Sequence, residues 1–472
     1  MAESTEDQTT DVQHFDDRMS DSDALMWSIE KDPMLRSTIT TVMLLDGQPD
    51  IDQLQRVFER ASRSIPRLRQ RVRSNPLSIA PPRWEVDPNF DLRYHLRSAR
   101  AIGEGTVRDV LDMAVPISMQ GFDRARPLWE ATYVDGLKDG GSALILKIHH
   151  SITDGVGGVE LMLELLDLDP SAPEREIGPA PQVHVMNQAE RFIDAFIHES
   201  KRGSDALGRV ISTGTDTLVS LRHDPVGSFN SASEIVSSAL KLLAPESQPM
   251  SLITHNRSLS SSFDVLTMPL DVAKKAGRSL GGTINDVFLA GIVSALDRYH
   301  GEHGANQQYL RMGMPINVRG AVSNNSGGNE WVPSRFVVEL RHSSLPELVS
   351  HIRTRALEAR DEPANSLVGP LSNLINRLPT TIVTQVFGMM MKGLDFQASN
   401  VPGSPLPVFI AGAPVTSVFP FGPLAGAGIN ITLLSYVNDL NIGVNIDPAS
   451  ISDPDVFMEI LRESYDEILA LA

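Results

Sequence analysis

The chain has 472 residues, of which 41% are hydrophobic and 21% charged, a composition typical of a folded globular protein rather than of a disordered one. It contains no cysteine, which excludes a disulfide framework, a cysteine-ligated metal site and a cysteine nucleophile. With 59 acidic and 41 basic residues its net charge is −18, which argues against general nucleic-acid binding, because neutralising phosphates requires a basic surface.

The amino-terminal segment is polar and acidic, so we expect residues 1–18 to be a disordered tail without a signal peptide, in a cytoplasmic protein. An α/β domain follows over residues 19–169. Its strands Tyr133–Leu137 and Ala143–Ile148 lead into a loop, His149–Gly157, and a helix.

A proline-rich linker and three helical segments form a predicted crossover over residues 170–260. A second α/β domain, residues 261–472, contains a long helix, Thr283–His300. The predicted strands of this domain are Tyr309–Pro315, Arg335–Leu340, Val408–Ala411, Ile429–Tyr436 and Leu440–Ile446. The uncharged run between Asp395 and Asp439 contains six prolines, which are typical of loops and strand ends rather than of a membrane-spanning helix.

The strongest chemical signal is a pair of adjacent histidines, His149 and His150, which end an apolar strand and are followed by Asp154 and Gly155. Imidazole titrates near neutrality and suits a general base, and the carboxylate can orient a ring or brace the loop. A buried, hydrogen-bonded histidine pair is the structural alternative. Adjacent histidines diverge from a strand end and no HExxH spacing occurs, so we expect no metal site. The absence of GxSxG and Walker motifs argues against serine-hydrolase and nucleotide-driven chemistry.

The HHxxxDG segment resembles the signature of the condensation-type acyltransferases. Three further segments, in the same order, make the chain from Met19 to Leu471 similar to the bacterial wax ester synthase/diacylglycerol acyltransferase family. These segments are Pro127-Leu128-Trp129, Asn285-Asp286 and Ser399-Asn400-Val401-Pro402-Gly403. The resemblance implies an α/β fold of the α+β type, with two domains similar to chloramphenicol acetyltransferase. Each domain would be a mixed sheet with helices, and an active-site tunnel would lie between them.

The resemblance also implies the reaction, in which a long-chain acyl group moves from acyl-CoA to diacylglycerol, with long-chain alcohols as further acceptors. His150 would be the general base, His149 would either assist or pack, and Asp154 would orient the loop that includes Gly155. No acyl-enzyme, metal or cofactor is needed, because acyl-CoA is a substrate. Two alternatives stay open: an acyltransferase of this fold for another hydroxyl or amine acceptor, and a non-catalytic lipid-binding protein.

The remaining candidates each have a structural alternative. The Pro127–Trp129 and Ser399–Gly403 segments are candidates for the tunnel wall, with core packing or a supporting turn as the alternative. Asn285 is expected to cap a helix with Asp286 in its first turn. The candidates for the CoA phosphates are Lys274, Lys275 and Arg278, together with the arginines between Arg67 and Arg73; the alternative for both groups is a solvated charged face. The run Thr380–Met391 is either part of the core or a lipid-facing surface. If it faces lipid, we expect peripheral association with a membrane or lipid droplet. The sequence does not indicate an oligomeric state.

Overall fold

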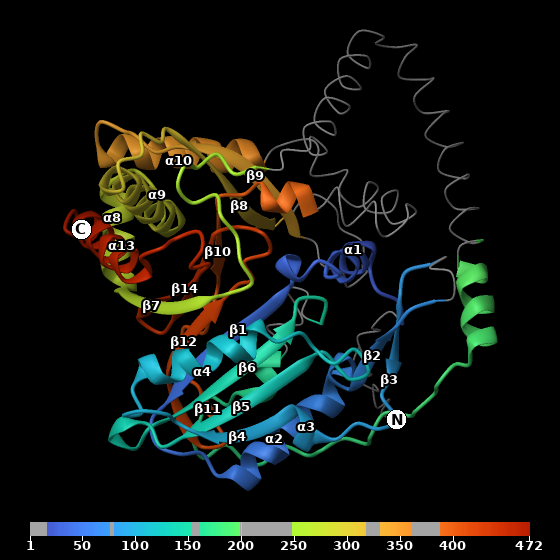
Figure 1. Cartoon of the computed structure of the whole chain (residues 1–472). Coiled ribbons are helices and arrows are strands. Elements are labelled where there is room, and N and C mark those ends of the chain that lie inside the picture. The colour runs from blue at the N-terminus through green and yellow to red at the C-terminus, as the bar shows by residue number, and fades with distance from the viewer. Residues whose placement is uncertain are drawn as a thin grey trace, which may run out of the picture.

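The computed structural model describes residues 17–75, 80–152, 161–198, 200, 248–317, 331–360 and 388–472. Two six-stranded sheets and a two-stranded hairpin organise these residues, with helices packed on the sheets (Figure 1). The predicted mixed α/β architecture of two halves is therefore confirmed. Most of the predicted tail and two of the three predicted crossover helices lie outside the described residues. The first crossover helix is present over residues 188–198.

The first sheet carries the histidine pair. Its strands in spatial order are β11 (Phe409–Ile410), β12 (Ala413–Phe421), β1 (Thr38–Leu45), β6 (Ser142–His149), β5 (Trp129–Asp135) and β4 (Leu96–Arg100). Only β4 and β5 pair in parallel. All eight residues of β6 are buried, because β6 is a central strand between β1 and β5. A continuous apolar run is what a strand covered on both faces requires.

Helices cover both faces of this sheet. The helix α2 (Ile51–Ser64) buries Leu54, Val57 and Phe58 in the cluster that includes Leu144 and Leu146 of β6. The helix α4 (Val107–Met119) packs on the other face, where Val110 and Leu111 join a second cluster. Alternate residues of β6 thus belong to different clusters, which follows from the two-residue period of a strand.

The second sheet is built from the C-terminal half. Its strands in spatial order are β7 (Ser262–Pro269), β14 (Asp439–Ile446), β13 (Ile429–Tyr436), β10 (Phe396–Val401), β8 (Tyr309–Asn317) and β9 (Trp331–Glu339). Its helices are α8 (Leu270–Ser279), α9 (Ile284–Glu302), α10 (Leu345–Arg360) and α13 (Pro454–Leu469), which gather on one side of it (Figure 1). Both sheets are mixed, since β10 pairs in parallel with β13 and β8.

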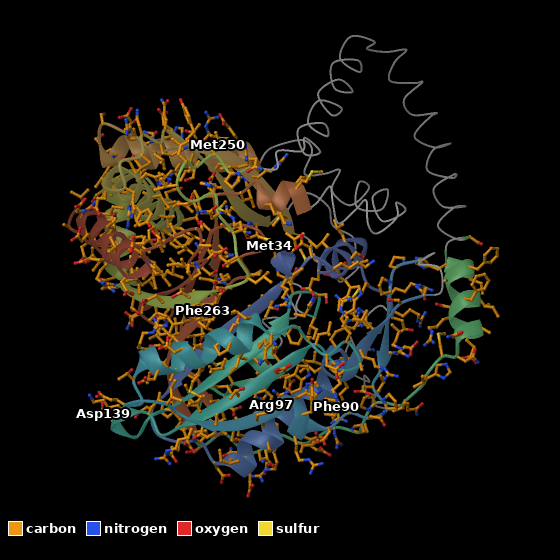
Figure 2. The ribbon with its side chains drawn as sticks, viewed as in Figure 1. Met34, Phe90, Arg97, Asp139, Met250 and Phe263 are labelled. Atoms are coloured by element: carbon orange, nitrogen blue, oxygen red, sulfur yellow. The ribbon has the colours of Figure 1, made fainter. Side chains whose placement is uncertain are left out.

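One strand pair crosses between the two halves. The strands β11 and β12 lie within the segment predicted to form the C-terminal domain, yet β12 pairs with β1 of the first sheet. No strand was expected at 413–421, because prolines at this density are typical of loops and strand ends. Gly443 of β14 lies against β12 so closely that a Cβ would be 1.9 Å from the carbonyl oxygen of Pro420. Phe263 lies at the boundary between the halves (Figure 2), and its ring stacks on that of Phe421 at 4.1 Å.

Among the described residues, no single helix has the length and apolar composition to cross a membrane. The pair α8 and α9 meets those two criteria only when the helices are taken together, and it bends by 85° at the break between them.

Candidate active site

The histidine pair is held where β6 ends between β1 and β5. His149 is the last residue of β6 and pairs with Thr38 of β1. Its backbone N–H donates to the carbonyl of Leu128 at 3.0 Å, and the N–H of His150 donates to the carbonyl of Ser37 at 2.9 Å. The backbone of both histidines is therefore fixed from two neighbouring segments. Asp154 and Gly155 lie outside the described residues, so their roles stay predictions.

The side chain of His149 is fully buried and hydrogen-bonded. Its Nδ1 accepts the backbone N–H of Ser151 at 3.1 Å and lies 2.7 Å from the Ser151 hydroxyl oxygen. We therefore assign the ring proton to Nε2, which lies 3.0 Å from Oε1 of Glu30. The rings of Trp27 and Phe122 contact the imidazole edge-on at 5.7 and 6.0 Å. Of the two alternatives for His149, these contacts favour packing over a direct role with substrate.

Glu30 is a site residue that the sequence analysis missed. It follows the helix α1 (Asp21–Ile29), and the chain then reverses through Pro33–Leu35 into β1. Its Oε1 accepts the N–H of Ser37 at 2.6 Å and faces Nε2 of His149. Burial opposes ionisation of Glu30, but the close contact with Nε2 of His149 and the hydrogen bond from Ser37 hold the pKa of its carboxyl below the usual value. No local sequence pattern links Glu30 to a histidine so far along the chain.

His150 differs from His149 in its exposure, since part of its side chain reaches solvent. Removal from water by the surrounding protein, together with the neighbouring His149, lowers the pKa of His150 to about 4. An imidazole with this pKa is neutral at physiological pH, which is the form that can accept a proton.

The predicted tunnel residues Leu128 and Trp129 lie in the core of the first half. Trp129 is 1% exposed, and its Nε1 donates to the carbonyl of Leu68 at 2.8 Å. Its ring stacks on His95 at 4.6 Å and on Phe58 at 5.8 Å. These contacts favour the core alternative for Trp129. The segment still contributes to the site, because the Leu128 carbonyl holds the backbone of His149.

Asn285 and the Ser399–Gly403 segment contact each other. Thr283, not Asn285, is the N-cap of α9, and it forms a capping box with Asp286, so the predicted cap was wrong by two residues. Because Asn285 does not cap the helix, its side-chain Oδ1 is available to accept a hydrogen bond from Nδ2 of Asn400 at 3.3 Å.

The Ser399–Gly403 segment is also more extended than predicted. Ser399 to Val401 belong to β10, and the turn begins only at Pro402. Gly403 is required there, because a Cβ would lie 2.0 Å from the carbonyl oxygen of Ser435.

The basic candidates lie apart from the histidines or in ion pairs. Lys274, Lys275 and Arg278 are on α8, beside α13 and away from α1 (Figure 1). Lys275 is 60% exposed and pairs with Asp271 at 3.3 Å, as a solvated face would. In the other group, the guanidinium of Arg67 lies over the Trp84 ring, Arg69 pairs with Glu59, and Arg71 lies 3.8 Å from Asp87. The second group therefore braces the first half, and the role of the α8 residues in binding CoA stays a prediction.

Comparison with known proteins agrees with this fold. The catalytic-domain model of the wax ester synthase/diacylglycerol acyltransferase family matches residues 19–288, and the model of its C-terminal domain matches residues 335–469. A putative diacylglycerol O-acyltransferase of Mycobacterium tuberculosis is 35% identical over 97% of this chain and 92% of its own length.

Solved structures show the same fold at low identity. A wax ester synthase/diacylglycerol acyltransferase from Marinobacter aquaeolei VT8 matches with a TM-score of 0.61 at 19% identity, over 96% of this chain and 98% of that one. The first condensation domain of the calcium-dependent antibiotic synthetase matches with a TM-score of 0.56 at 14% identity, over 96% and 95% of the two chains. The fold is thus that of the condensation-type acyltransferases. The chain belongs to the wax ester synthase/diacylglycerol acyltransferase family and is an O-acyltransferase.

Proposed function

We propose that this protein transfers a long-chain acyl group from acyl-CoA to the free hydroxyl of diacylglycerol, with long-chain alcohols as further acceptors. The family and the names of the relatives support this substrate class. The observation that carries the mechanism is His150, which is partly exposed at the end of a buried strand and neutral at physiological pH.

In the proposed reaction the neutral ring of His150 takes the proton of the acceptor hydroxyl as its oxygen attacks the thioester carbonyl. The new C–O bond forms, the C–S bond breaks, and the imidazolium returns its proton to the departing thiolate. The products are one ester and one CoA thiol. A positioned general base typically contributes about 10²- to 10⁴-fold to such a rate, and positioning of the two substrates adds the rest.

The substrate class is tested by thiol release from palmitoyl-CoA with diacylglycerol, with hexadecanol and without acceptor. We expect release that depends on acceptor, and the better acceptor names the main product. Release confined to a non-lipid hydroxyl or amine would contradict the proposed acceptor. Binding of acyl-CoA without turnover on any acceptor would favour the lipid-binding alternative instead.

The pH dependence of kcat/KM follows from the lowered pKa of His150. The base form is already present well below pH 6, so we expect a nearly constant kcat/KM between pH 5 and 7. The loss of activity should begin only as the pH falls toward about 4, where the ring becomes protonated. Steady-state rates with saturating acceptor check this, and an inflection near the ordinary histidine pKa of about 6.5 would contradict it.

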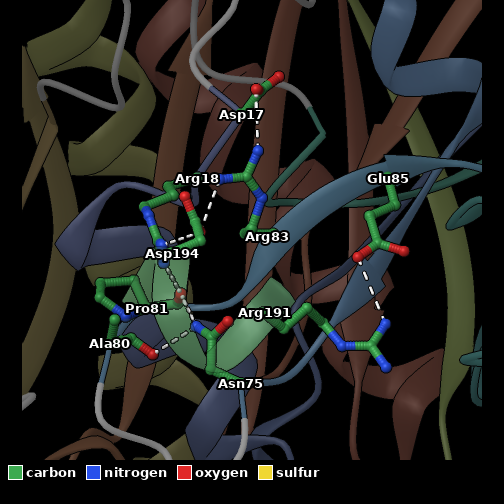
Figure 3. A network of polar contacts seen from close by, with 9 residues as sticks. All are labelled: Asp17, Arg18, Asn75, Ala80, Pro81, Arg83, Glu85, Arg191 and Asp194. Carbon is green, nitrogen blue, oxygen red and sulfur yellow. Dashed lines mark hydrogen bonds and ion pairs between the residues drawn. The ribbon is translucent and has the colours of Figure 1, made fainter. Parts of the chain in front are cut away.

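We also propose that the protein docks on lipid surfaces through the helix at 188–198. Its polar face is tied to the hairpin of β2 (Gln70–Arg73) and β3 (Arg83–Val86): Arg191 lies 3.4 Å from Glu85, and Asp194 lies 2.8 Å from Arg83 (Figure 3). The opposite face then points outward. Its exposed members are Phe192 at 41%, Ile193 at 56%, Phe196 at 61% and Ile197 at 48%. A helix normally buries such an apolar face against other protein. Because the proposed substrates are insoluble in water, this face can instead bind the lipid surface that contains them.

The run predicted from the sequence to be either core or lipid-facing, Thr380–Met391, is described only from residue 388. Met391 packs against the cluster of Leu25, Ile29 and Leu35, so its end belongs to the core of the N-terminal region.

Replacing both phenylalanines of the helix, Phe192→Ser with Phe196→Ser, should lower the fraction that floats with phosphatidylcholine–triolein emulsions about tenfold, because apolar area no longer enters the lipid. Leu471→Ser, which alters an exposed apolar residue at the carboxyl end, is the matched control and should float like the wild type. A wild-type protein that stays with the aqueous phase, or a double variant that floats unchanged, would contradict the proposal.

A further inference from the structure

A buried lysine lies two residues before the first histidine. Lys147 and His149 are on the same face of β6, because side chains alternate along a strand. Lys147 is 0% exposed, and its Nζ has no hydrogen-bond partner among the residues that the structure describes. The ammonium lies 4.4 Å from the centroid of the Phe122 ring, which also contacts His149. A buried ammonium without hydrogen bonds is costly, so this position calls for a reason beyond packing.

Charged groups surround Lys147 from four elements. Glu130 of β5 lies 3.9 Å away and is also 3.5 Å from Arg97 of β4. Glu30 at the end of α1 and Arg36 before β1 act on the same ammonium. Arg124, whose guanidinium lies 4.2 Å from the centroid of the Trp27 ring, acts on the Glu30 carboxylate. Burial, the largest influence, lowers the pKa of Lys147 to about 8, while Glu130 and Glu30 favour its charged form.

Glu30 supports the position of His150 through its contacts with two neighbours, His149 and Ser37. Its carboxylate faces Nε2 of His149, the residue directly before His150. The same Oε1 accepts the N–H of Ser37, whose carbonyl in turn accepts the N–H of His150. One carboxylate therefore fixes the side chain that precedes His150 and the backbone segment that holds it.

We propose that Glu30 is the positioning residue of His150, and that the buried ammonium of Lys147, in addition to Arg124, favours the ionised Glu30 carboxylate that faces His149. The inference rests on the proposed function, since it concerns the orientation of the base in that reaction. Neither residue touches the reacting atoms; each acts through His149 and Ser37.

A purely structural ion network would behave differently when it is removed. Removing one partner of a buried ion pair leaves the other charge buried, which costs stability whether or not catalysis depends on the pair. Lys147→Met should therefore lower the thermal midpoint, but only modestly, because Glu130 keeps Arg97 as a partner. On the proposed role it should also lower kcat, because the Glu30–His149 pair loses one supporting charge.

The test compares kcat, KM and thermal midpoints of Glu30→Gln, Lys147→Met and the double variant. Misplacing a catalytic group by about 1 Å can cost about 10²-fold, so we expect kcat of Glu30→Gln to fall about that much, with KM for acyl-CoA changed less than about twofold. The kcat of Lys147→Met should fall about tenfold or less, and the double variant should lose no more kcat than Glu30→Gln, because both act through one pair.

The pH profile is the second measurement. The wild type should lose activity as the pH rises through about 8, and Lys147→Met should not show this loss.

Asp447→Asn is the matched control, because Asp447 is a buried carboxylate that accepts the backbone N–H and the hydroxyl of Ser258 rather than facing the histidines. It should lower the midpoint without lowering kcat. Full kcat in Glu30→Gln would overturn the inference, as would a loss in KM alone. If Glu30→Gln folds poorly, the Lys147→Met variant provides the test instead. Full kcat and an unchanged pH profile in Lys147→Met would overturn the role of the lysine. A wild type without acceptor-dependent thiol release would instead contradict the proposed function.

Discussion

His150→Ala should lower kcat by about 10²- to 10⁴-fold, because alanine cannot take the proton of the acceptor hydroxyl. The variant should fold like the wild type, since the backbone N–H of residue 150 still reaches the Ser37 carbonyl. KM for acyl-CoA should change little, because the ring acts on the reacting hydroxyl rather than on the donor's distant groups. Initial rates of thiol release, with circular dichroism to verify folding, measure the effect.

His303→Ala is the matched histidine control. His303 is the C-cap residue of α9, where its Nδ1 lies 2.8 Å from the Tyr299 carbonyl oxygen and its Nε2 lies 3.3 Å from Asp453. It should keep its kcat even if the helix end is weakened. A folded His150→Ala protein with the turnover of the wild type would show that His150 is not the general base.

Gly443→Ala should destabilise the protein by about 3 kcal/mol or more, because the added Cβ enters the backbone of the neighbouring strand. The Cβ would lie 1.9 Å from the carbonyl oxygen of Pro420, and the Phe421 ring follows at 3.2 Å. A flexible side chain could move aside, but β12 is held in the first sheet by its pairing with β1. The contact lies where the strand of one half crosses the sheet of the other, so both halves should lose stability. Urea denaturation measures the change.

Gly301→Ala tests whether glycine loss alone explains such an effect. Gly301 lies in the last turn of α9, and a Cβ there meets nothing within 4 Å. Alanine is the better helix former by about 1 kcal/mol, so this variant should be as stable as the wild type or slightly more stable. Equal stability of the two glycine variants would contradict the close approach of β12 and β14.

Features that depend on local pattern were predictable from the sequence. The apolar run before His149 predicted β6, and the spacing of apolar residues predicted α2 and α9. The strand at 429–436 has the predicted bounds. In these segments the residues that decide the element are neighbours in the chain, so the two-residue or 3.6-residue period is visible directly.

Features that depend on distant contacts were not predictable. Glu30 has no local signal, because its role arises only when β1 and β6 bring Ser37 and His149 to the end of α1. The strand β12 was not predicted, because Pro414 and Pro420 are typical of loops and strand ends, yet it pairs with β1 over residues 415–421. Asn285 was expected to be the cap because asparagine caps well, but Thr283 with Asp286 forms the better reciprocal pair.

The central claim, ester formation that uses His150 as the base, is tested most directly by counting both products of one reaction. Labelled palmitoyl-CoA and diacylglycerol would be given to the wild type and to His150→Ala, and ester and free thiol would be measured together. We expect one labelled triacylglycerol for each thiol in the wild type, and the loss of both products in the variant. Thiol release without ester in the wild type, or ester formation that persists in folded His150→Ala, would contradict it.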